Sequence, residues 1–151
     1  MKAIFLFNFA QFVDWPAEAF PAPDSPLIIG VLGNDPFGAF LDETLRDEHV
    51  GDHPVKLQRF SRVDNISICH ILFISRSERN HLDEILATLS GRSILTVGDS
   101  GDFAVRGGMI ACVTERNKVR LKINLEAARN AGLVLSSKLL RPAEIVAGGG
   151  I

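Results

Sequence analysis

Residues 27–36 of the chain read LIIGVLGNDP, a short apolar run followed by a turn and the start of a helix. A run of this length that ends at Gly33 is typical of a strand buried on both faces of a sheet. Asp35 and Pro36 predict the helix start, because aspartate caps helices and proline suits the first helical position. The order of strand, turn and helix predicts an α/β fold.

The middle of the chain repeats this pattern. Residues 54–60 alternate between apolar and polar side chains, as expected of a half-exposed strand, and residues 69–74 and 93–97 form two further apolar runs. Between those runs, residues 75–91 predict an amphipathic helix that ends at Gly91 and places four side chains on one face, namely Leu82, Ile85, Leu86 and Leu89. Strands that alternate with helices through short connections favour parallel pairing with right-handed crossovers.

The pattern changes in the last third of the chain. Residues 109–114 and 118–123 flank a tight polar turn and predict an antiparallel hairpin. Asn124 is expected to cap a short helix that ends at Gly132, before a final apolar segment. We therefore predict a single-domain, three-layer α/β sandwich over residues 1–147, with a mixed sheet of about six strands flanked by helices, and a flexible glycine-rich tail over residues 148–151.

The N-terminal residues 2–14 are apolar nearly all round, which predicts a largely buried helix that ends before Trp15 and Pro16. Its polar residues interrupt the run too early for a secretory signal, so we expect that any such signal lies upstream of Met1. No stretch reaches 18 consecutive apolar residues, so we expect no membrane insertion.

Charge excludes one class of partner. The chain carries 18 acidic and 16 basic residues that are interspersed, so nucleic-acid binding is not expected. Alternation in the strand 118–123 places Lys118, Arg120 and Lys122 on one face. That stripe suits either an acidic partner or, as we favour, a solvated face that discourages aggregation at the sheet edge.

No recognisable catalytic set is present. The four histidines are scattered over different predicted elements, and the sequence contains no metal-binding or nucleotide-binding motif, so we predict no cofactor and no metal. Cys69 and Cys112 lie in apolar runs, where a buried and inert thiol is the common state, although an exposed thiol would allow a thiol-dependent enzyme. We predict that the protein is not an enzyme.

Loops that follow three of the predicted parallel strands should meet at one edge of the sheet, where open α/β folds bind ligands. The candidate ligand-binding residues there are Asn34, Asp35, Arg76, Ser77 and Asp99. The alternative is that these residues only cap helices and form turns, and we favour it because such caps are far more common than ligand sites.

Several segments occur in an order that resembles the YfiR family of bacterial periplasmic regulators. The resemblance covers about residues 2–146 and is carried by segments that read KAIFLFNFAQFVDWP at 2–16, GNDPFG at 33–38, CHILFISRSE at 69–78, TVGD at 96–99, GGMI at 107–110 and INLEAAR at 123–129. Each piece is weak alone, but the ordered combination is specific.

The resemblance implies a periplasmic, non-enzymatic protein that binds and restrains a membrane-anchored diguanylate cyclase in c-di-GMP signalling. It also implies a signal peptide upstream, dimer formation and a response to redox state through disulfides. We expect the partner to contact the C-terminal segment 133–146, with Leu133, Leu135, Leu139 and Leu140 as the candidate contact residues. The alternative function is a small-ligand binding domain that uses the loop edge described above.

The chain departs from the family pattern at its cysteines. Relatives often pair the cysteine matching Cys69 with one at the position of Gly30, and Cys112 similarly lacks its partner around residues 104–107. A direct bond between Cys69 and Cys112 would require adjacent strands, and we consider it the less favoured arrangement. Lys122 replaces a residue that is commonly acidic in relatives, so the family's redox response and charge pattern need not transfer.

Overall fold

A computed structural model describes residues 2–146, and the predicted tail at 148–151 lies outside the described residues. The α-helices are α1 (Lys2–Gln11), α2 (Ala39–Leu45), α3 (Leu82–Leu89), α4 (Leu125–Asn130) and α5 (Ser137–Leu140). Three 3₁₀ segments are η1 (Ala17–Ala19), η2 (Val63–Asn65) and η3 (Arg76–His81). The strands are β1 (Val13–Asp14), β2 (Leu27–Leu32), β3 (His49–Val50), β4 (His53–Phe60), β5 (Ile71–Ile74), β6 (Leu95–Gly98), β7 (Ile110–Glu115), β8 (Lys118–Ile123), β9 (Val134–Leu135) and β10 (Glu144–Ile145).

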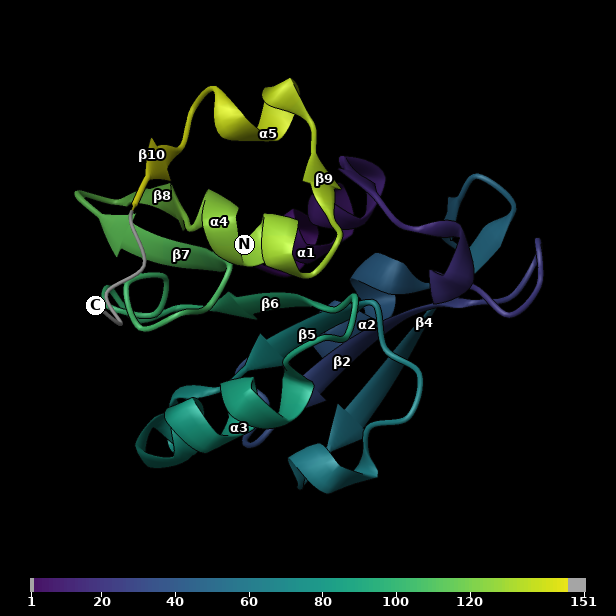
Figure 1. Ribbon diagram of the computed structural model, residues 1–151, viewed down its shortest axis with the longest axis horizontal. Helices are drawn as coiled ribbons and strands as arrows, with labels where there is room; N and C mark the ends of the chain where they lie inside the picture. Colours follow the sequence, from purple (N-terminus) through teal and green to yellow (C-terminus); the bar gives the residue numbers. More distant parts are fainter. Residues whose placement is uncertain (1, 147–151) are drawn as a thin grey trace.

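One mixed sheet organises the molecule, with the strand order β10-β8-β7-β6-β5-β2-β4-β3 (Figure 1). Strands β4, β2, β5, β6 and β7 pair in parallel, whereas β8 runs antiparallel to β7 and β3 runs antiparallel to β4. The two outermost strands, β3 and β10, have two residues each, which leaves the predicted six longer strands. The predicted α/β sandwich with a mixed sheet is confirmed.

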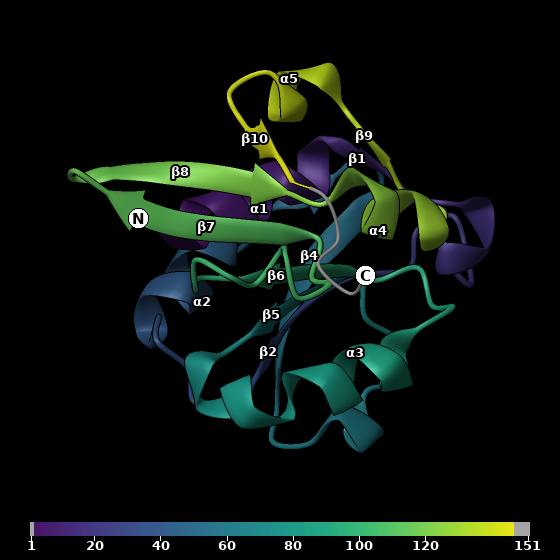
Figure 2. The ribbon, with the colours of Figure 1, turned by 60° about the vertical axis from the view of Figure 1, so that its left-hand side comes forward.

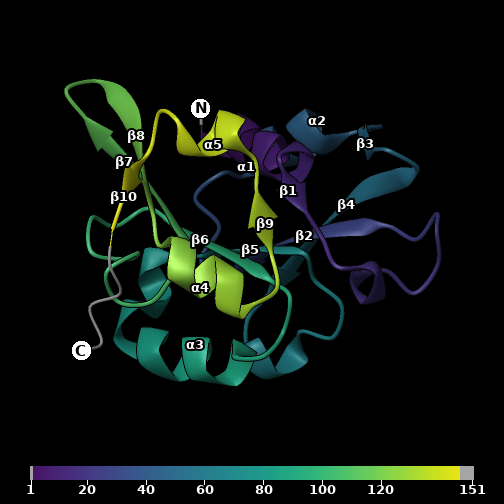
Figure 3. The ribbon, with the colours of Figure 1, turned by 45° about the horizontal axis from the view of Figure 1, so that its top comes forward.

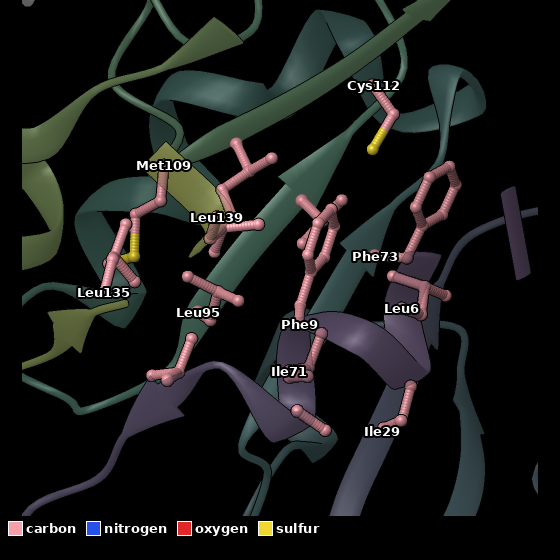
Figure 4. Packing of buried hydrophobic residues seen from close by; sticks show 14 of the residues in the cluster. Leu6, Phe9, Ile29, Ile71, Phe73, Leu95, Met109, Cys112, Leu135 and Leu139 are labelled. Carbon is pink, nitrogen blue, oxygen red and sulfur yellow. The ribbon is translucent and has the colours of Figure 1, made fainter. Parts of the chain in front are cut away.

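Helices pack on both faces of the sheet (Figure 3). The larger apolar cluster lies on one face, where α1, α2, α4 and α5 contribute side chains such as Leu6, Phe9 and Leu139 (Figure 4). The smaller cluster lies on the opposite face beneath α3 and includes Ile85 and Leu89. Alternate residues of β5, such as Phe73 and Leu72, belong to the two different clusters, because side chains alternate along a strand. All six residues of β2 are therefore buried.

The hairpin of β7 and β8 projects from the body of the domain (Figure 2). Arg116 and Asn117 form its two-residue turn, and both have positive φ, 50° and 66°, as a type I′ turn requires. Asn124 caps α4 by accepting a hydrogen bond from the Ala127 N–H at 3.1 Å, and Gly132 follows that helix with a φ of 77°. The predicted hairpin and cap are confirmed.

Two predicted helix boundaries are wrong. The first helix ends at Gln11, because Val13 and Asp14 pair antiparallel with Leu135 and Val134 instead of continuing it. The second helix begins at Ala39 rather than after Asp35. Asp35 forms a local turn instead, in which its carboxylate accepts hydrogen bonds from the N–H groups of Phe37 and Gly38.

The helix predicted over residues 75–91 has two parts. It begins with the six-residue 3₁₀ segment η3 and continues as α3, and the Ser75 hydroxyl caps the start by accepting from the Ser77 N–H. Ser77 therefore does not cap this helix. Within residues 2–146, no helix is both long and apolar enough to cross a membrane.

Candidate functional site

The predicted loop edge forms where β2, β5 and β6 end. The Asn34 N–H donates a hydrogen bond to the Ser77 hydroxyl at 2.9 Å, and that hydroxyl contacts Ser75 at 3.3 Å. The chain after β2 is thus fastened to the start of η3. Both residues were predicted to meet here, and the structure brings them together.

Arg76 and Asp99 form a second contact along the same edge. The guanidinium of Arg76 donates to the Asp99 carboxylate at 3.1 Å and to the Asp99 carbonyl at 3.0 Å. The cavity beside them holds only about 10 Å³, which is room for about one water molecule. The two side chains meet as predicted, but the space between the loops does not accommodate an organic ligand.

Asp35 takes part in neither of these contacts and instead binds Arg59, a residue that was not predicted to belong to the site. Arg59 of β4 donates to Asp35 at 2.6 Å, to Asp42 of α2 at 2.9 Å and to the Gly38 carbonyl at 3.2 Å. The hydrogen bond from Arg59 is the main cause that lowers the pKa of the Asp42 carboxyl below its usual value. The position of Arg59 near the end of β4, beside the same edge, was the available signal. These contacts join β4 to α2, so the five candidate residues divide among three local contacts rather than converging on one ligand.

The two cysteines lie on opposite faces of the sheet. Cys69 belongs to the cluster beneath α3, and Cys112 belongs to the cluster beneath α1, so the structure does not place one thiol against the other. The Cys69 side chain is 6% exposed, and burial raises the pKa of its thiol to about 12. A thiol that stays protonated near neutral pH is a poor nucleophile, which weighs against a thiol-dependent enzyme.

The C-terminal leucines are core residues. Leu133, Leu135 and Leu139 are buried in the larger cluster and Leu140 is partly buried against it, which corrects the expectation that these four side chains present an apolar surface. Side chains along β9 alternate between the exterior and the core, which was not predicted from the sequence. Val134 faces outward with 62% of its surface exposed, between two leucines that anchor the segment.

The basic stripe belongs to β8, one strand of the projecting hairpin (Figure 2). Lys118 and Arg120 are exposed, and Lys122 is half-buried. Their cross-strand neighbours on the same face include Glu115 opposite Lys118 and Glu144 opposite Lys122. Carboxylates at both ends of the stripe reduce its net charge, which is consistent with the solvated face favoured from the sequence.

No metal-binding cluster is found in the described part of the chain. Among residues 2–146, no group of three or more His, Cys, Asp or Glu side chains is placed to hold a metal ion. His49 and His81 lie apart from one another, while His53 and His70 lie on either side of the Phe20 ring. That last arrangement was not predicted, because it depends on a connector that crosses the sheet edge.

A family model for YfiR/HmsC-like proteins matches residues 1–144. The chain belongs to the YfiR/HmsC-like family. This membership suggests a periplasmic regulator of c-di-GMP signalling, and the family is one of regulators rather than of known enzymes. No curated protein matches the sequence at a significant level.

Family membership gives meaning to Gly30, which lies in the middle of β2. A Cβ atom placed on Gly30 would lie 3.1 Å from the Sγ atom of Cys69. That matches the spacing across a disulfide, where a sulfur–sulfur bond of about 2.05 Å places the Cβ atom of one cysteine about 3 Å from the sulfur of the other. The geometry agrees with the expectation that Gly30 stands where YfiR-like relatives carry the partner of Cys69.

Proposed function

We propose that this YfiR/HmsC-like protein is a non-enzymatic periplasmic regulator that binds a membrane-anchored diguanylate cyclase and restrains it. The observation that carries the proposal is the match of the family model to residues 1–144, which is nearly the whole domain. Loss of the regulator's fold or of its contact with the partner would then release the cyclase. We propose a homodimer as the binding form, as in family members of this type.

The C-terminal segment remains our proposed contact region, with a different set of side chains. Val134 and Ile145 are the exposed large apolar residues of the segment, since Leu133, Leu135 and Leu139 are committed to the core. Exposed aliphatic side chains on a rigid, well-anchored segment suit a protein partner, because their burial contributes to affinity without reordering the domain.

The loop edge supports the alternative function less well. Asn34 contacts Ser77 and Arg76 contacts Asp99, and the cavity beside Arg76 and Asp99 is about the size of one water molecule. A small ligand would have to replace these contacts before it could bind. The contacts therefore favour a purely structural role, in which these residues hold the ends of β2, β5 and β6 together.

A membrane pull-down tests the proposal. The tagged protein is incubated with detergent-solubilised membranes of its own organism, and captured proteins are identified by mass spectrometry and assayed for diguanylate cyclase activity. We expect the wild type to capture a cyclase with a periplasmic sensor region and to lower its activity. Recovery of no cyclase from such membranes would contradict the proposal.

A pair of matched variants locates the surface. Val134→Asp should reduce capture about tenfold, since one charged group at an apolar contact costs on the order of 1–2 kcal/mol of binding free energy. Val105→Asp alters an exposed valine on a different loop and should leave capture unchanged. Equal capture by both variants would place the contact outside the C-terminal segment.

A further inference from the structure

Residues 15–26, which we call the strap, join β1 to β2 and are held against the sheet by aromatic rings. The Phe20 ring lies between the imidazoles of His53 and His70, with ring centroids 3.7 Å and 4.4 Å away and nearly parallel planes. The Trp15 ring meets His70 edge-on at 5.6 Å. His53 begins β4 and His70 precedes β5, so the strap is clamped at the amino ends of two parallel strands.

Hydrogen bonds fix the protonation state of His70. Its Nε2 lies 2.8 Å from the Ala19 carbonyl of the strap, and its Nδ1 accepts from the Ile28 N–H at 2.9 Å. A carbonyl only accepts and an N–H only donates, so the docked ring is neutral and carries its proton on Nε2. His53 adds a parallel contact from its Nδ1 to the Ser25 carbonyl at 2.7 Å.

A second proton on His70 is incompatible with this arrangement. A protonated Nδ1 would face the Ile28 N–H, and the residue is 1% exposed, so bulk water does not reach the added proton to accept a hydrogen bond from it. Burial is the main cause that lowers the pKa of His70; the hydrogen bond to the Ala19 carbonyl opposes this shift, and the nearby His53 adds to it. The charged groups of the strap itself are Glu18 and Asp24, and Arg92 lines the same hollow as Glu18.

We propose that His70 is a proton-sensitive clamp, whose protonation in mildly acidic conditions releases the strap from the sheet while the rest of the domain stays folded. Release brings His70 into contact with water and restores the ordinary imidazole pKa of 6.5. If the docked ring takes up no proton, the equilibrium for release rises by up to about 30-fold between pH 7.5 and pH 5.0. The Trp15 Nε1 atom assists release, because it is buried without a hydrogen-bond partner among the described residues.

Release also opens a hollow beside a thiol. Glu18, Ala19 and Pro21 of the strap line this hollow of about 310 Å³, and Cys69 lines it as well. The thiol is nearly inaccessible while the strap is docked. Cys69 thus reports on the strap from within the same hollow, whereas Cys112 lies on the other face of the sheet.

Two probes of the full chain test the clamp. Trp15 is the single tryptophan, so its emission reports on the strap directly. In a Cys112→Ser background, the rate of Cys69 labelling by 4,4′-dithiodipyridine is measured from pH 7.5 to pH 5.0, relative to the same reaction in denaturant at each pH. We expect the relative rate to rise between about 10-fold and 30-fold, with a red shift of Trp15 emission and unchanged far-ultraviolet circular dichroism.

Two histidine variants separate the clamp from general acid sensitivity. In His70→Asn, the amide oxygen can still accept from the Ile28 N–H but cannot titrate, so both signals should become independent of pH. His81→Asn removes an exposed histidine elsewhere and should retain the full response. Wild-type signals that do not change with pH, an unchanged response in His70→Asn, or loss of circular dichroism in step with labelling would each overturn the proposal.

Discussion

Gly30 and Cys69 are packed against each other with no room for an added side chain unless a neighbour moves. The Cβ position of Gly30 lies 3.1 Å from the Cys69 Sγ atom and 2.7 Å from Cε2 of Phe60. The first distance suits a bond between two cysteines, and the second requires the Phe60 ring to shift. Phe60 is only partly buried at the end of β4, so its ring has space to do so.

We predict that Gly30→Cys forms a disulfide with Cys69 under oxidising conditions. The bond would close a loop of about 40 residues and stabilise the protein by on the order of 3–4 kcal/mol, less the cost of moving Phe60. Mass spectrometry of the unreduced protein detects the bond, and thermal unfolding with and without reductant measures its effect. Gly30→Cys combined with Cys69→Ser is the control and should show only the cost of overpacking.

Thiol labelling of the oxidised Gly30→Cys variant can contradict this pairing. If the thiols at positions 30 and 69 of the oxidised Gly30→Cys variant both react with a labelling reagent in denaturant, the two positions are farther apart in solution than in the structure. The family expectation that Gly30 replaces a paired cysteine would then be wrong.

The N-terminal helix is part of the core, and two variants on it should differ sharply. Phe9→Ala removes a fully buried ring from the larger cluster and should lower the free energy of unfolding by about 3–5 kcal/mol. Ile4→Ala changes a side chain with 53% exposure and should alter stability by less than about 0.5 kcal/mol. Urea unfolding measures both, and equal effects would mean that α1 does not pack as described.

Arg59 should control the ionisation of Asp42. We expect Arg59→Met to raise the pKa of the Asp42 carboxyl toward its ordinary value, because the hydrogen bond that holds it down is removed. Since the folded-state pKa is lowered in the wild type, the associated stability is present above about pH 4 and is lost as pH falls further. An NMR titration of the Asp42 carboxyl checks the shift, and Arg62→Met, which removes only an exposed pair with Asp64, should leave it unchanged.

The turn of the projecting hairpin can be improved. Arg116 and Asn117 both occupy left-handed backbone conformations, which asparagine and glycine adopt at lower cost. Replacing the pair by Arg116→Asn and Asn117→Gly should stabilise the domain by about 0.5–1 kcal/mol, as measured by thermal unfolding. A decrease in the melting temperature would show that this turn is not of type I′.

Regular elements with local signals were predictable from the sequence. Residues 27–32 form a buried strand because every side chain in the run is apolar or absent, and the hairpin follows from its alternation and turn. Boundaries that depend on distant residues were not predictable. Val13 and Asp14 leave the first helix because they pair with a strand more than a hundred residues later, which no local pattern indicates.

The sequence allowed us to predict where the candidate site residues lie, but not whether they contact a ligand or one another. Parallel strands brought Asn34 to Ser77 and Arg76 to Asp99, as the topology required. Whether those groups face a ligand or each other depends on side-chain distances of a few ångströms. The contact between Phe20 and the two histidines was missed for a related reason, since turn-rich connectors carry no periodicity that shows what they cover.

The short pairing of β1 with β9 affects how the chain folds. The segment after α1 obtains its backbone partner only when residues 134 and 135 are available, which lie more than a hundred residues further along the chain. Contacts between sequence-distant residues slow folding. A polypeptide that cannot complete this pairing until residues 134 and 135 have been synthesised stays in an open form for longer.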